Sequence, residues 1–489
     1  MAECNAQAAG ACSEAEGSQT IASGAASHAE GYLTQSIGPA SHAEGGGSAA
    51  AGVYAHAEGE ATRAPGDNAH AEGFGTAANA SSSHAEGYLT QAGGPGSHAE
   101  GGGAIASGLY AHAEGNETRA MGAHSHAEGQ ITMATGFNAH AEGELTQASG
   151  LDSHAEGMET IASGQGAHAE GERNTASGRA SHAEGNLNTA SGIAAHAEGQ
   201  RALASGDLSH AEGSQTIASG QGAHAEGLIT TASGLAAHAQ GALTVADGLF
   251  SHAQGLGTQA AGLDGVHVMG RFGIANEESY SWYLANGNSE LELGIAAKIL
   301  SSGNVKIDGA LSTPAADYAE MFETADGKPI EPGYFVAFEA EKVRIAQPGD
   351  RYIAGVTSAR PAIVADSGEL RWEGKYVTDE WGRIVYRDEE APGVLDRQGQ
   401  TVVPGRRERR PVLNPAWDPT IPYTPRAQRP EWVAVGMLGK LLVRDDGSCQ
   451  AGRCCVVGEG GIATDSENGY YVLKRTGARQ ILIMLGITY

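Results

Sequence analysis

The sequence predicts an all-β protein in which a long parallel β-solenoid is followed by a smaller, mainly β domain. Three observations lead to this prediction. Seventeen of the 19 histidines recur every fourteen residues between His28 and His252, glycine supplies 73 of the 489 residues, and aromatic residues make up only 6%. A strict short period indicates one small unit stacked many times, and so few aromatic residues cannot build a thick apolar core.

Net charge and hydropathy exclude two classes of partner. Residues 1–262 contain 27 Asp and Glu against five Arg and no Lys, a net charge of −22 out of −28 for the whole chain. Phosphate groups are bound by Lys and Arg, so we expect no nucleic-acid partner. No apolar run approaches the roughly 18–20 residues of a membrane span, and the first residues lack the basic start and apolar stretch of a secretory signal. We therefore expect no membrane insertion.

The cysteines predict neither disulfides nor a metal site. There are five, at positions 4, 12, 449, 454 and 455. An odd number in a chain without a recognisable signal indicates reduced thiols. Cys449, Cys454 and Cys455 could offer three thiolates to zinc, but no fourth ligand is evident. We predict no metal and no cofactor.

After an N-terminal segment, residues 1–12, the repeat occupies residues 13–262. Its unit reads His-Ala-Glu-Gly-x-x-Thr-x-Ala-x-Gly-x-x-(Ser/Ala). A coiled coil is excluded, because there is no apolar seam and each interior glycine costs a helix about 1 kcal/mol. We predict coils of two short strands with glycine at positive-φ turns, stacked at ~4.8 Å so that seventeen coils span ~80 Å.

The ends of the repeat are degraded, as capping units are in stacked arrays. Ser13–Gly17 carries Glu in place of His, and Val266–Gly270 lies one residue out of register. A coil lined by Ala, Ser, Thr and Gly buries little apolar surface alone. Association into a homotrimer would bury more of it.

The unit resembles the repeats of trimeric adhesin heads, which are left-handed parallel β-rolls. In those proteins a Ser-Val-Ala-Ile-Gly-like strand recurs every fourteen residues, and Ser27–Gly31 fits it with His and Glu at the apolar positions. The resemblance implies a left-handed β-roll and a trimer.

The His and Glu of each unit share one face of a strand and should form two columns along the rod. Carboxylates ~5 Å apart repel by roughly 3 kcal/mol per neighbour at an effective dielectric of 20. We expect the interleaved His side chains to relieve that repulsion through hydrogen bonds or charge. Metal binding by His and Glu is the alternative.

Two other columns suggest binding surfaces. Thr occupies the seventh position of twelve of the seventeen units, which favours a supporting hydrogen-bonded ladder and leaves a flat ice-binding face as the alternative. The variable positions should point outward and are the candidates for contact with a host-surface receptor or glycan. They include Tyr32, Phe74, Tyr88, Tyr110 and Phe137.

Residues 263–316 should form a β-rich collar. Strands are expected near 279–284, 291–293 and 304–308, between Gly and Asn turns. Thr313 and Pro314 then have the order of an N-cap and a first helical residue, which predicts a helix entering the next domain.

Residues 317–489 have a different composition, with Lys, Trp and Pro. Apolar segments at 333–338, 352–356 and 437–443 predict strands, and the Pro- and Arg-rich stretch 404–431 predicts a long ordered loop. The result is a compact, mainly β domain.

Several segments of this domain resemble the self-cleaving C-terminal chaperone domain of phage pre-neck appendage proteins, which is classed among the glutamic peptidases. The resemblance covers essentially all of residues 313–489 and implies that the domain drives trimerisation and then severs the chain once, at its own N-terminal edge. The segments that carry it are Ala316-Asp-Tyr-Ala-Glu-Met-Phe-Glu323, Gly333-Tyr-Phe-Val336, Gly374-Lys-Tyr-Val-Thr-Asp-Glu380, Gly436-Met-Leu-Gly-Lys440 and Val443-Arg-Asp-Asp-Gly447.

Matched to the family, Asp317 and Glu320 are its essential acids and the cut lies between Ala316 and Asp317. The residues permit this chemistry. No Ser, Thr or Cys follows the bond, so an acyl shift has no nucleophile, whereas two carboxylates can activate water and protonate the leaving amine. On a helical turn, residues three apart share a face, which would pair the two acids. The alternative is an acidic first turn that simply suits the helix dipole.

These observations predict a homotrimeric fibre of the phage tail-spike or neck-appendage kind, encoded by a phage or a prophage, that acts as a single-turnover, self-cleaving endopeptidase. It would be made in the host cytoplasm and end in the virion. The alternatives are a bacterial surface adhesin and a purely structural solenoid, each with an uncleaved, inactive C-terminal domain.

Overall fold

The computed structural model describes residues 5–395, 398–403 and 405–488; residues 1–4 of the predicted N-terminal segment, including Cys4, lie outside this part. The chain divides into two compact units, residues 1–310 and 311–489. Within the described ranges the only helices are three single turns of 3₁₀ helix, Glu373–Lys375, Arg426–Gln428 and Glu459–Gly461. The predicted all-β class is therefore confirmed. No helix in the described part is long and apolar enough to cross a membrane.

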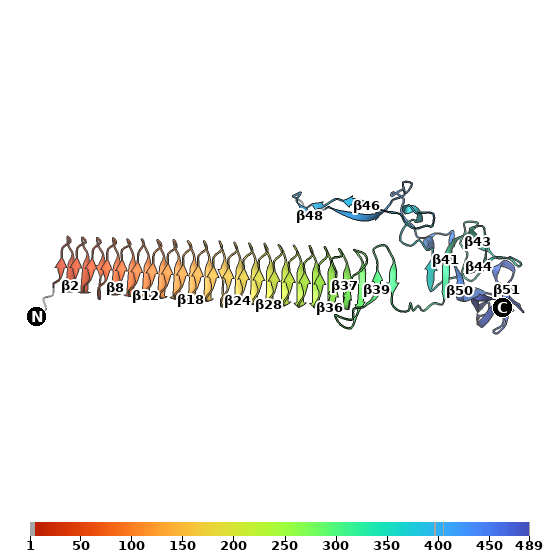
Figure 1. The fold of residues 1–489 in the computed structure, drawn as a ribbon, viewed down its shortest axis with the longest axis horizontal. Helices are drawn as coiled ribbons and strands as arrows, with labels where there is room; N and C mark the ends of the chain where they lie inside the picture. The colour runs from red at the N-terminus through yellow and green to blue at the C-terminus, as the bar shows by residue number, and fades with distance from the viewer. Residues whose placement is uncertain (1–4, 396–397, 404, 489) are drawn as a thin grey trace. The chain divides into compact units, whose positions relative to one another are not determined.

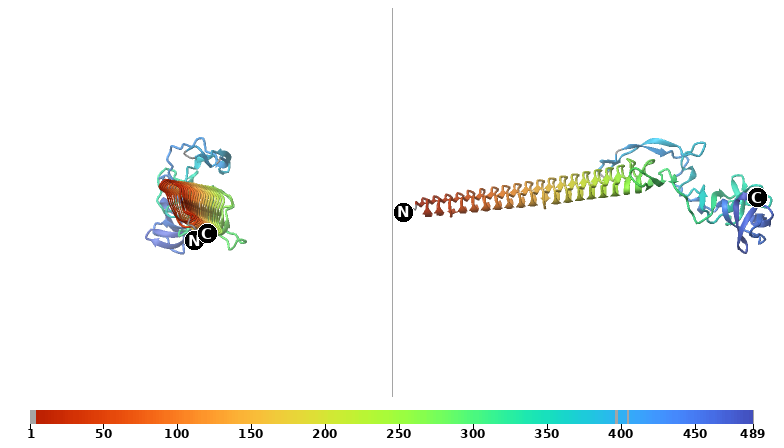
Figure 2. Two further views of the ribbon diagram at one scale, coloured as in Figure 1. Left: turned by 90° about the vertical axis from the view of Figure 1, so that its left-hand side faces the viewer. Right: turned by 60° about the horizontal axis from the view of Figure 1, so that its bottom comes forward.

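The first unit is a parallel β-solenoid of about 20 turns (Figure 1). Most coils contribute a longer strand that begins at the His and a two-residue strand that begins seven positions later, as in β8 (His56–Glu60) and β9 (Arg63–Ala64); in two coils the strand at the His, β6 (His42–Ala43) or β22 (His154–Ala155), also has two residues. Neighbouring coils pair in parallel with equivalent residues opposite one another, so that His56 pairs with His70 of β10 (His70–Phe74). Seen end-on in Figure 2, the coils lie one behind another. The predicted parallel solenoid is confirmed.

Small side chains fill the inside of every coil. Ala57, Thr62 and Ala64 are completely buried, and the equivalent Ala, Thr and Ser residues of the other coils have exposures of 0–2%. Two short strands back to back leave room for small side chains, of which Asn174 and Asn188, at the position of Thr62, are the largest in this column. The Thr columns therefore lie inside the rod, so the ice-binding alternative is wrong: such a face would need those hydroxyls on the surface. The favoured hydrogen-bonded ladder is wrong as well at most units, because nine of the twelve Thr hydroxyls, such as that of Thr62, have no hydrogen-bond partner among the described residues.

The two glycines of each unit act differently. At the fourth position Gly143 has φ +103°, and a Cβ there would lie 2.1 Å from the carbonyl oxygen of Gly157 in the next coil. At the eleventh position Gly136 has no positive φ, but its Cβ would lie 1.9 Å from the carbonyl oxygen of Gly150. Most left-handed corners are formed by other residues, such as Leu145 (φ 58°). The shared role of the two glycines is thus to let successive coils stack closely. The predicted positive φ is found at the glycine of the fourth position, but the corners of the coil are mostly formed by other residues.

The His and Glu columns lie on the outside of the coils. The ring centroids of successive histidines are 4.4–4.9 Å apart, for example 4.8 Å between His56 and His70. Burial lowers the pKa of His56. The Nε2 atom of His56 lies 3.7 Å from a carboxylate oxygen of Glu58, which is too far for a hydrogen bond. Instead, hydrogen bonds that Glu44 shares with Glu30 and Glu58 raise the pKa of Glu44 to about 7. The predicted relief of repulsion by His hydrogen bonds is therefore not found at His56, whose Nε2 atom lies at ion-pair distance from the carboxylates of Glu44 and Glu58, as the alternative of relief by charge requires.

The variable aromatic side chains point outward, as predicted. Their exposed fractions are 55% for Tyr32, 41% for Phe74, 57% for Tyr88, 62% for Tyr110 and 48% for Phe137.

Parallel stacking continues beyond the regular repeat. The strands β36 (His252–Gln259), β37 (His267–Ile274) and β38 (Trp282–Asn286) pair in parallel, and the antiparallel strands β39 (Ile295–Ile299) and β40 (Val305–Ile307) end the sheet. The strands expected near 279–284 and 304–308 are confirmed. The one expected at 291–293 is wrong, because Leu291 lies in the turn between β38 and β39 with an exposed fraction of 96%.

The second unit is built on a ten-stranded sheet. Eight of its strands follow the order β43-β42-β44-β50-β54-β53-β51-β52, while β41 pairs with β50 and β45. The expected strands at 333–338, 352–356 and 437–443 correspond to β42, β44 and β50. The bounds are β41 Asp317–Glu323, β42 Phe335–Glu339, β43 Lys342–Ile345, β44 Ile353–Thr357, β45 Ile363–Ala365, β50 Trp432–Arg444, β51 Cys454–Val457, β52 Ala463–Ser466, β53 Tyr470–Gly477 and β54 Gln480–Thr488.

Two small ladders lie outside this sheet: β46 (Tyr386–Ala391) pairs with β49 (Arg406–Pro411), and β47 (Val394–Leu395) pairs with β48 (Thr401–Val403). The loop predicted over 404–431 is therefore wrong at 406–411. Strand pairing places Arg407 opposite Glu390, with the side chains 3.1 Å apart. Acidic side chains on β46 offset the positive charge of the arginines on β49, so this segment can form a strand.

The three cysteines of the second unit are free thiols, and two of them lie in its core. Cys449 and Cys455 are buried, and burial raises the pKa of Cys449 to about 11. Zinc binds thiolates, so a thiol that holds its proton this firmly is a poor ligand.

An ion pair between a buried aspartate and a partly exposed arginine stabilises the second unit. The carboxylate of Asp445, 1% exposed, accepts hydrogen bonds from Arg475 at 2.6 and 3.2 Å. We expect Asp445→Ala to lower the free energy of unfolding by about 2 kcal/mol, because the guanidinium loses its charged partner and keeps only carbonyl acceptors, those of Cys449, Gly477 and Ala478. The measurement is denaturant unfolding followed by tryptophan fluorescence, which reports this unit because four of the five Trp lie in it. The control Asp326→Ala, at an exposed pair 3.8 Å long, should change it by less than about 0.5 kcal/mol. Equal effects of the two changes would contradict the prediction.

Candidate active site

The predicted cleavage junction enters the sheet of the second unit as a strand. β41 begins at Asp317 and lies between β50, which is antiparallel to it, and β45, which is parallel. The helix predicted from Thr313 and Pro314 is wrong, because both edges of β41 use their backbone groups to bond neighbouring strands. Thr313 still caps a bend: its hydroxyl donates to the carbonyl oxygen of Ala315 at 3.0 Å.

The two predicted acids therefore do not share a face. Side chains alternate along a strand, so residues three apart point to opposite sides. Burial along β41 alternates accordingly, with Asp317, Ala319 and Met321 buried and Tyr318 and Glu320 half-buried. The helical pairing of Asp317 with Glu320 is wrong, since both belong to an extended strand.

Asp317 occupies the buried face. Its exposed fraction is 5%, and its Oδ2 atom has no hydrogen-bond partner among the described residues. The carboxyl group fits there because Gly436 of β50 has no side chain: a Cβ on Gly436 would lie 3.0 Å from Oδ2. Burying a charged carboxylate without a hydrogen-bond partner costs free energy. Such a group is stable there only if it is protonated or binds a water molecule.

The Ala316–Asp317 peptide bond is held on both sides. The Lys440 N–H donates to the carbonyl oxygen of Ala316 at 3.4 Å, and the Ala362 N–H donates to the carbonyl oxygen of Asp317 at 2.8 Å. Below the bond lies Gly439, with φ +109°, where a Cβ would stand 2.2 Å from the Ala316 oxygen. The Ala316 carbonyl group thus lies against the backbone of β50 at Gly439, a position that a residue with a side chain could not occupy without moving it.

Glu320 is held on the other face of β41 by Tyr318. The Tyr318 hydroxyl donates to Oε1 of Glu320 at 2.7 Å, and this hydrogen bond raises the pKa of Tyr318. The phenol orients the carboxylate without neutralising it.

A pocket of about 780 Å³ opens beside the bond. It is lined by Ala315, Ala316 and Asp317, by Glu331 and Thr357, and by the basic residues Arg360, Lys440, Arg444 and Arg479. The peptide bond is therefore accessible from one side, and cationic side chains stand near the place where a new carboxylate would form.

The site contains four residues to which the sequence assigned no role: Tyr318, Gly436, Gly439 and Lys440. Two glycines three residues apart in an apolar strand signal a close backbone approach. That signal was present in Gly436-Met-Leu-Gly439, but it does not say which segment approaches.

A known protein family matches the part of the chain that contains this strand. Residues 267–479 match the family model described as Peptidase_G2, IMC autoproteolytic cleavage domain. The resemblance predicted from the sequence is confirmed. The matched region contains all of β41, the Ala316–Asp317 bond and the glycines of β50.

Similar proteins come from phages and from one bacterium. The chain is 32% identical over 199 residues to the pre-neck appendage protein of Bacillus phage B103, covering 38% of this chain and 22% of that one. It is 32% identical over 205 residues to the pre-neck appendage protein of Bacillus phage phi29, covering 42% and 21%, and 32% identical over 178 residues to the putative phage-related protein YobO of Bacillus subtilis strain 168, covering 36% and 21%. The chain thus spans about a fifth of the length of these relatives.

Among solved structures, a C-terminal fragment of gene product 12 of bacteriophage phi29 aligns over 35% of this chain and 99% of its own length, with 34% identity and a TM-score of 0.28.

Proposed function

We propose that this chain is a homotrimeric phage appendage or tail-spike fibre whose C-terminal domain promotes trimer assembly and then cuts the chain once, between Ala316 and Asp317. One observation carries the proposal: that bond is pressed onto the glycines of β50, and the unpartnered Asp317 carboxyl is buried beside it. In this role the protein would be made in the host cytoplasm and end in the virion, with the outward aromatics of the rod available to a host receptor or glycan.

The reaction is the hydrolysis of one peptide bond. A water oxygen adds to the carbonyl carbon of Ala316, the bond to the Asp317 nitrogen breaks, and that nitrogen takes up a proton. The Lys440 N–H, already directed at the carbonyl oxygen, stabilises the developing oxyanion. Asp317 lies where it can transfer a proton to its own amine, which leaves the activation of water to a second carboxylate.

Glu320 supplies that carboxylate from a neighbouring copy in the trimer. Within one chain it points away from the face that Asp317 occupies, held by Tyr318. A second copy that packs its Glu320 face against the open pocket would complete the site. Cleavage would then follow assembly, as a chaperone that releases itself requires.

The first experiment is expression of the full chain and of Asp317→Asn and Glu320→Gln. The wild type should give fragments of 316 and 173 residues (489 − 316 = 173) by denaturing gel and intact mass. Each variant should be cut at least about 10²-fold more slowly, the usual contribution of general acid–base catalysis. The control Glu323→Gln, on the same strand but paired with Lys342, should be cut normally. A wild-type chain that forms a folded trimer by light scattering and stays uncut would overturn the cleavage proposal and favour the adhesin alternative.

A mixing experiment tests the shared site. When Asp317→Asn and Glu320→Gln chains of different tag length are coexpressed, mixed trimers contain intact Asp317 in one chain and intact Glu320 in another. We expect fragments from the Glu320→Gln chain alone. If neither chain is cut in mixed trimers, both acids act within one copy.

A further inference from the structure

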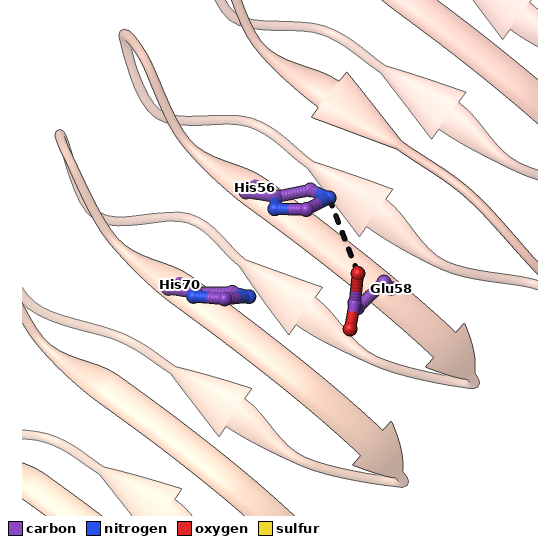
Figure 3. A group of neighbouring side chains, drawn as sticks. All are labelled: His56, Glu58 and His70. Atoms are coloured by element: carbon purple, nitrogen blue, oxygen red, sulfur yellow. Dashed lines mark ion pairs between the residues drawn. The ribbon is translucent and has the colours of Figure 1, made fainter.

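The His and Glu columns present the same group of donor atoms at almost every coil of the rod. Figure 3 shows one case: the rings of His56 and His70 lie parallel on successive coils, and the Glu58 carboxylate points toward the space between them. One ring nitrogen of each His and one carboxylate oxygen of Glu58 all lie within 4.8 Å of one another, and equivalent groups of two His and one Glu recur along the rod.

The imidazole nitrogens facing the Glu column have no hydrogen-bond partner. The Nε2 atom of every His in the regular column from His28 to His252 is buried and unpartnered among the described residues. The ring of His56 has its Nε2 between two carboxylates of successive coils, 3.8 Å from Glu44 and 3.7 Å from Glu58. The same arrangement recurs at His140, His154 and His182, where both distances are 3.8–4.0 Å.

These distances suit an ion between the donor atoms. Zinc binds His nitrogen at about 2.0–2.1 Å and carboxylate oxygen at about 2.0–2.2 Å, so two donors on one ion stand about 3.4 Å apart in a tetrahedral site and at most about 4.3 Å apart when they lie opposite one another. An imidazole nitrogen and a carboxylate oxygen at 3.7–3.8 Å satisfy that limit with small side-chain movements. Two stacked histidines do not, because their lone pairs run parallel in rings 4.8 Å apart.

The surroundings attract cations. Two open grooves, of about 590 and 520 Å³, are lined only by Glu and Gly residues of successive coils. No Lys occurs before residue 263, and residues 1–262 carry a net charge of −22 (27 acidic against five basic residues). Imidazole beside carboxylate favours Zn²⁺, Ni²⁺, Cu²⁺ and Co²⁺ over Mg²⁺ and Ca²⁺, which prefer oxygen ligands alone.

We propose that the ladder binds divalent transition-metal ions such as Zn²⁺, each held by the Nε2 atom of one His and by the carboxylates of its own coil and the preceding coil, with water at the remaining positions. Filling every coil would place doubly charged ions about 5 Å apart, so alternate coils are filled. The fifteen His-Ala-Glu-Gly units provide fourteen pairs of successive Glu, which gives about seven ions per chain. Metal would cross-link coils that are otherwise joined by backbone hydrogen bonds and small side chains.

Two coils of the rod already lack the Glu ligand. In the last two regular units Gln240 and Gln254 replace Glu, and both coils keep the parallel register of the others. Substituting Glu by Gln in the ladder should therefore remove the charged ligand without unfolding the coil.

The test uses the full chain, stripped with EDTA and dialysed against micromolar Zn²⁺ in millimolar Mg²⁺, with bound metal measured by mass spectrometry. One variant replaces four successive ladder acids, Glu128, Glu142, Glu156 and Glu170, by Gln. The control replaces four acids of the rod outside the ladder, Glu60, Glu117, Glu144 and Glu172, by Gln, which changes the net charge equally.

We expect about seven Zn²⁺ per wild-type chain, the same number for the control, and roughly one third fewer for the ladder variant, whose four acids belong to five of the fourteen pairs. Bound Co²⁺ should show no thiolate charge-transfer band, which separates the ladder from Cys449, Cys454 and Cys455. Zn²⁺ that is lost in millimolar Mg²⁺, or retained equally by the ladder and control variants, would overturn the proposal. Normal far-UV circular dichroism of both variants excludes unfolding as the cause of a loss.

Discussion

A chain carrying Gly439→Ala should remain uncut. Gly439 has φ +109°, and a Cβ at this position would lie 2.2 Å from the carbonyl oxygen of Ala316, far inside van der Waals contact. The methyl group must push the Ala316–Asp317 bond off β50 and away from the Lys440 N–H. A misplacement of about 1 Å costs about 10²-fold in rate, and the loss of an oxyanion donor costs a further 10²–10³-fold. We therefore expect at least about a 10³-fold fall in the cleavage rate, measured from fragment accumulation on denaturing gels.

The matched control is Gly447→Ala, just beyond the same strand. Gly447 has φ +97°, so it carries a similar backbone strain, but nothing lies within 4 Å of its added Cβ. This variant should be cut at close to the wild-type rate. Normal cutting of Gly439→Ala would mean that the bond is cleaved in some other conformation.

The second large effect is expected in the rod, from Gly143→Ala. The residue has φ +103°, a region that costs side-chain-bearing residues about 1–3 kcal/mol, and its new Cβ would lie 2.1 Å from the Gly157 carbonyl oxygen. The coils cannot separate locally without losing their ladder of hydrogen bonds. We expect a local loss of about 3 kcal/mol or more in the free energy of opening, measured by hydrogen exchange over the coils that contain residues 129–157.

Gly166→Ala is its control. Gly166 also has positive φ (+62°), with nothing within 4 Å of an added Cβ. Ala180 and Ala194 occupy the equivalent corner in the next two coils with φ of 55° and 53°. Hydrogen exchange should therefore change by less than about 0.5 kcal/mol. Because each coil contacts only its neighbours, the effect of Gly143→Ala should fade within a few coils, and unfolding of the whole rod would contradict this nearest-neighbour behaviour.

The site illustrates how far local sequence patterns reach. The segment Asp317-Tyr-Ala-Glu-Met-Phe-Glu323 contains good helix formers as well as strand formers, and Thr313 and Pro314 precede it in the order of a helix start. Local signals therefore favoured a helix, in which Asp317 and Glu320 of the same chain would lie on one face. The segment is a strand because it pairs with β50. That strand lies more than a hundred residues further along the chain, and its backbone hydrogen bonds hold residues 317–323 in an extended conformation.

For the rod, the sequence by itself determined the architecture. Each strand residue of a solenoid pairs with the residue fourteen positions away, and the fourteen-residue period of the sequence predicts that pairing directly. The strand positions, the parallel register, the small-residue interior and the outward aromatics all follow from it. Only the tertiary structure decided three points: most of the inward Thr hydroxyls and the His Nε2 atoms of the regular column lack hydrogen-bond partners within the described part of the chain, the second sheet extends the segment that begins at Asp317, and Asp317 and Glu320 face opposite sides of that strand. Each is fixed by packing between residues whose order in the chain does not reveal it.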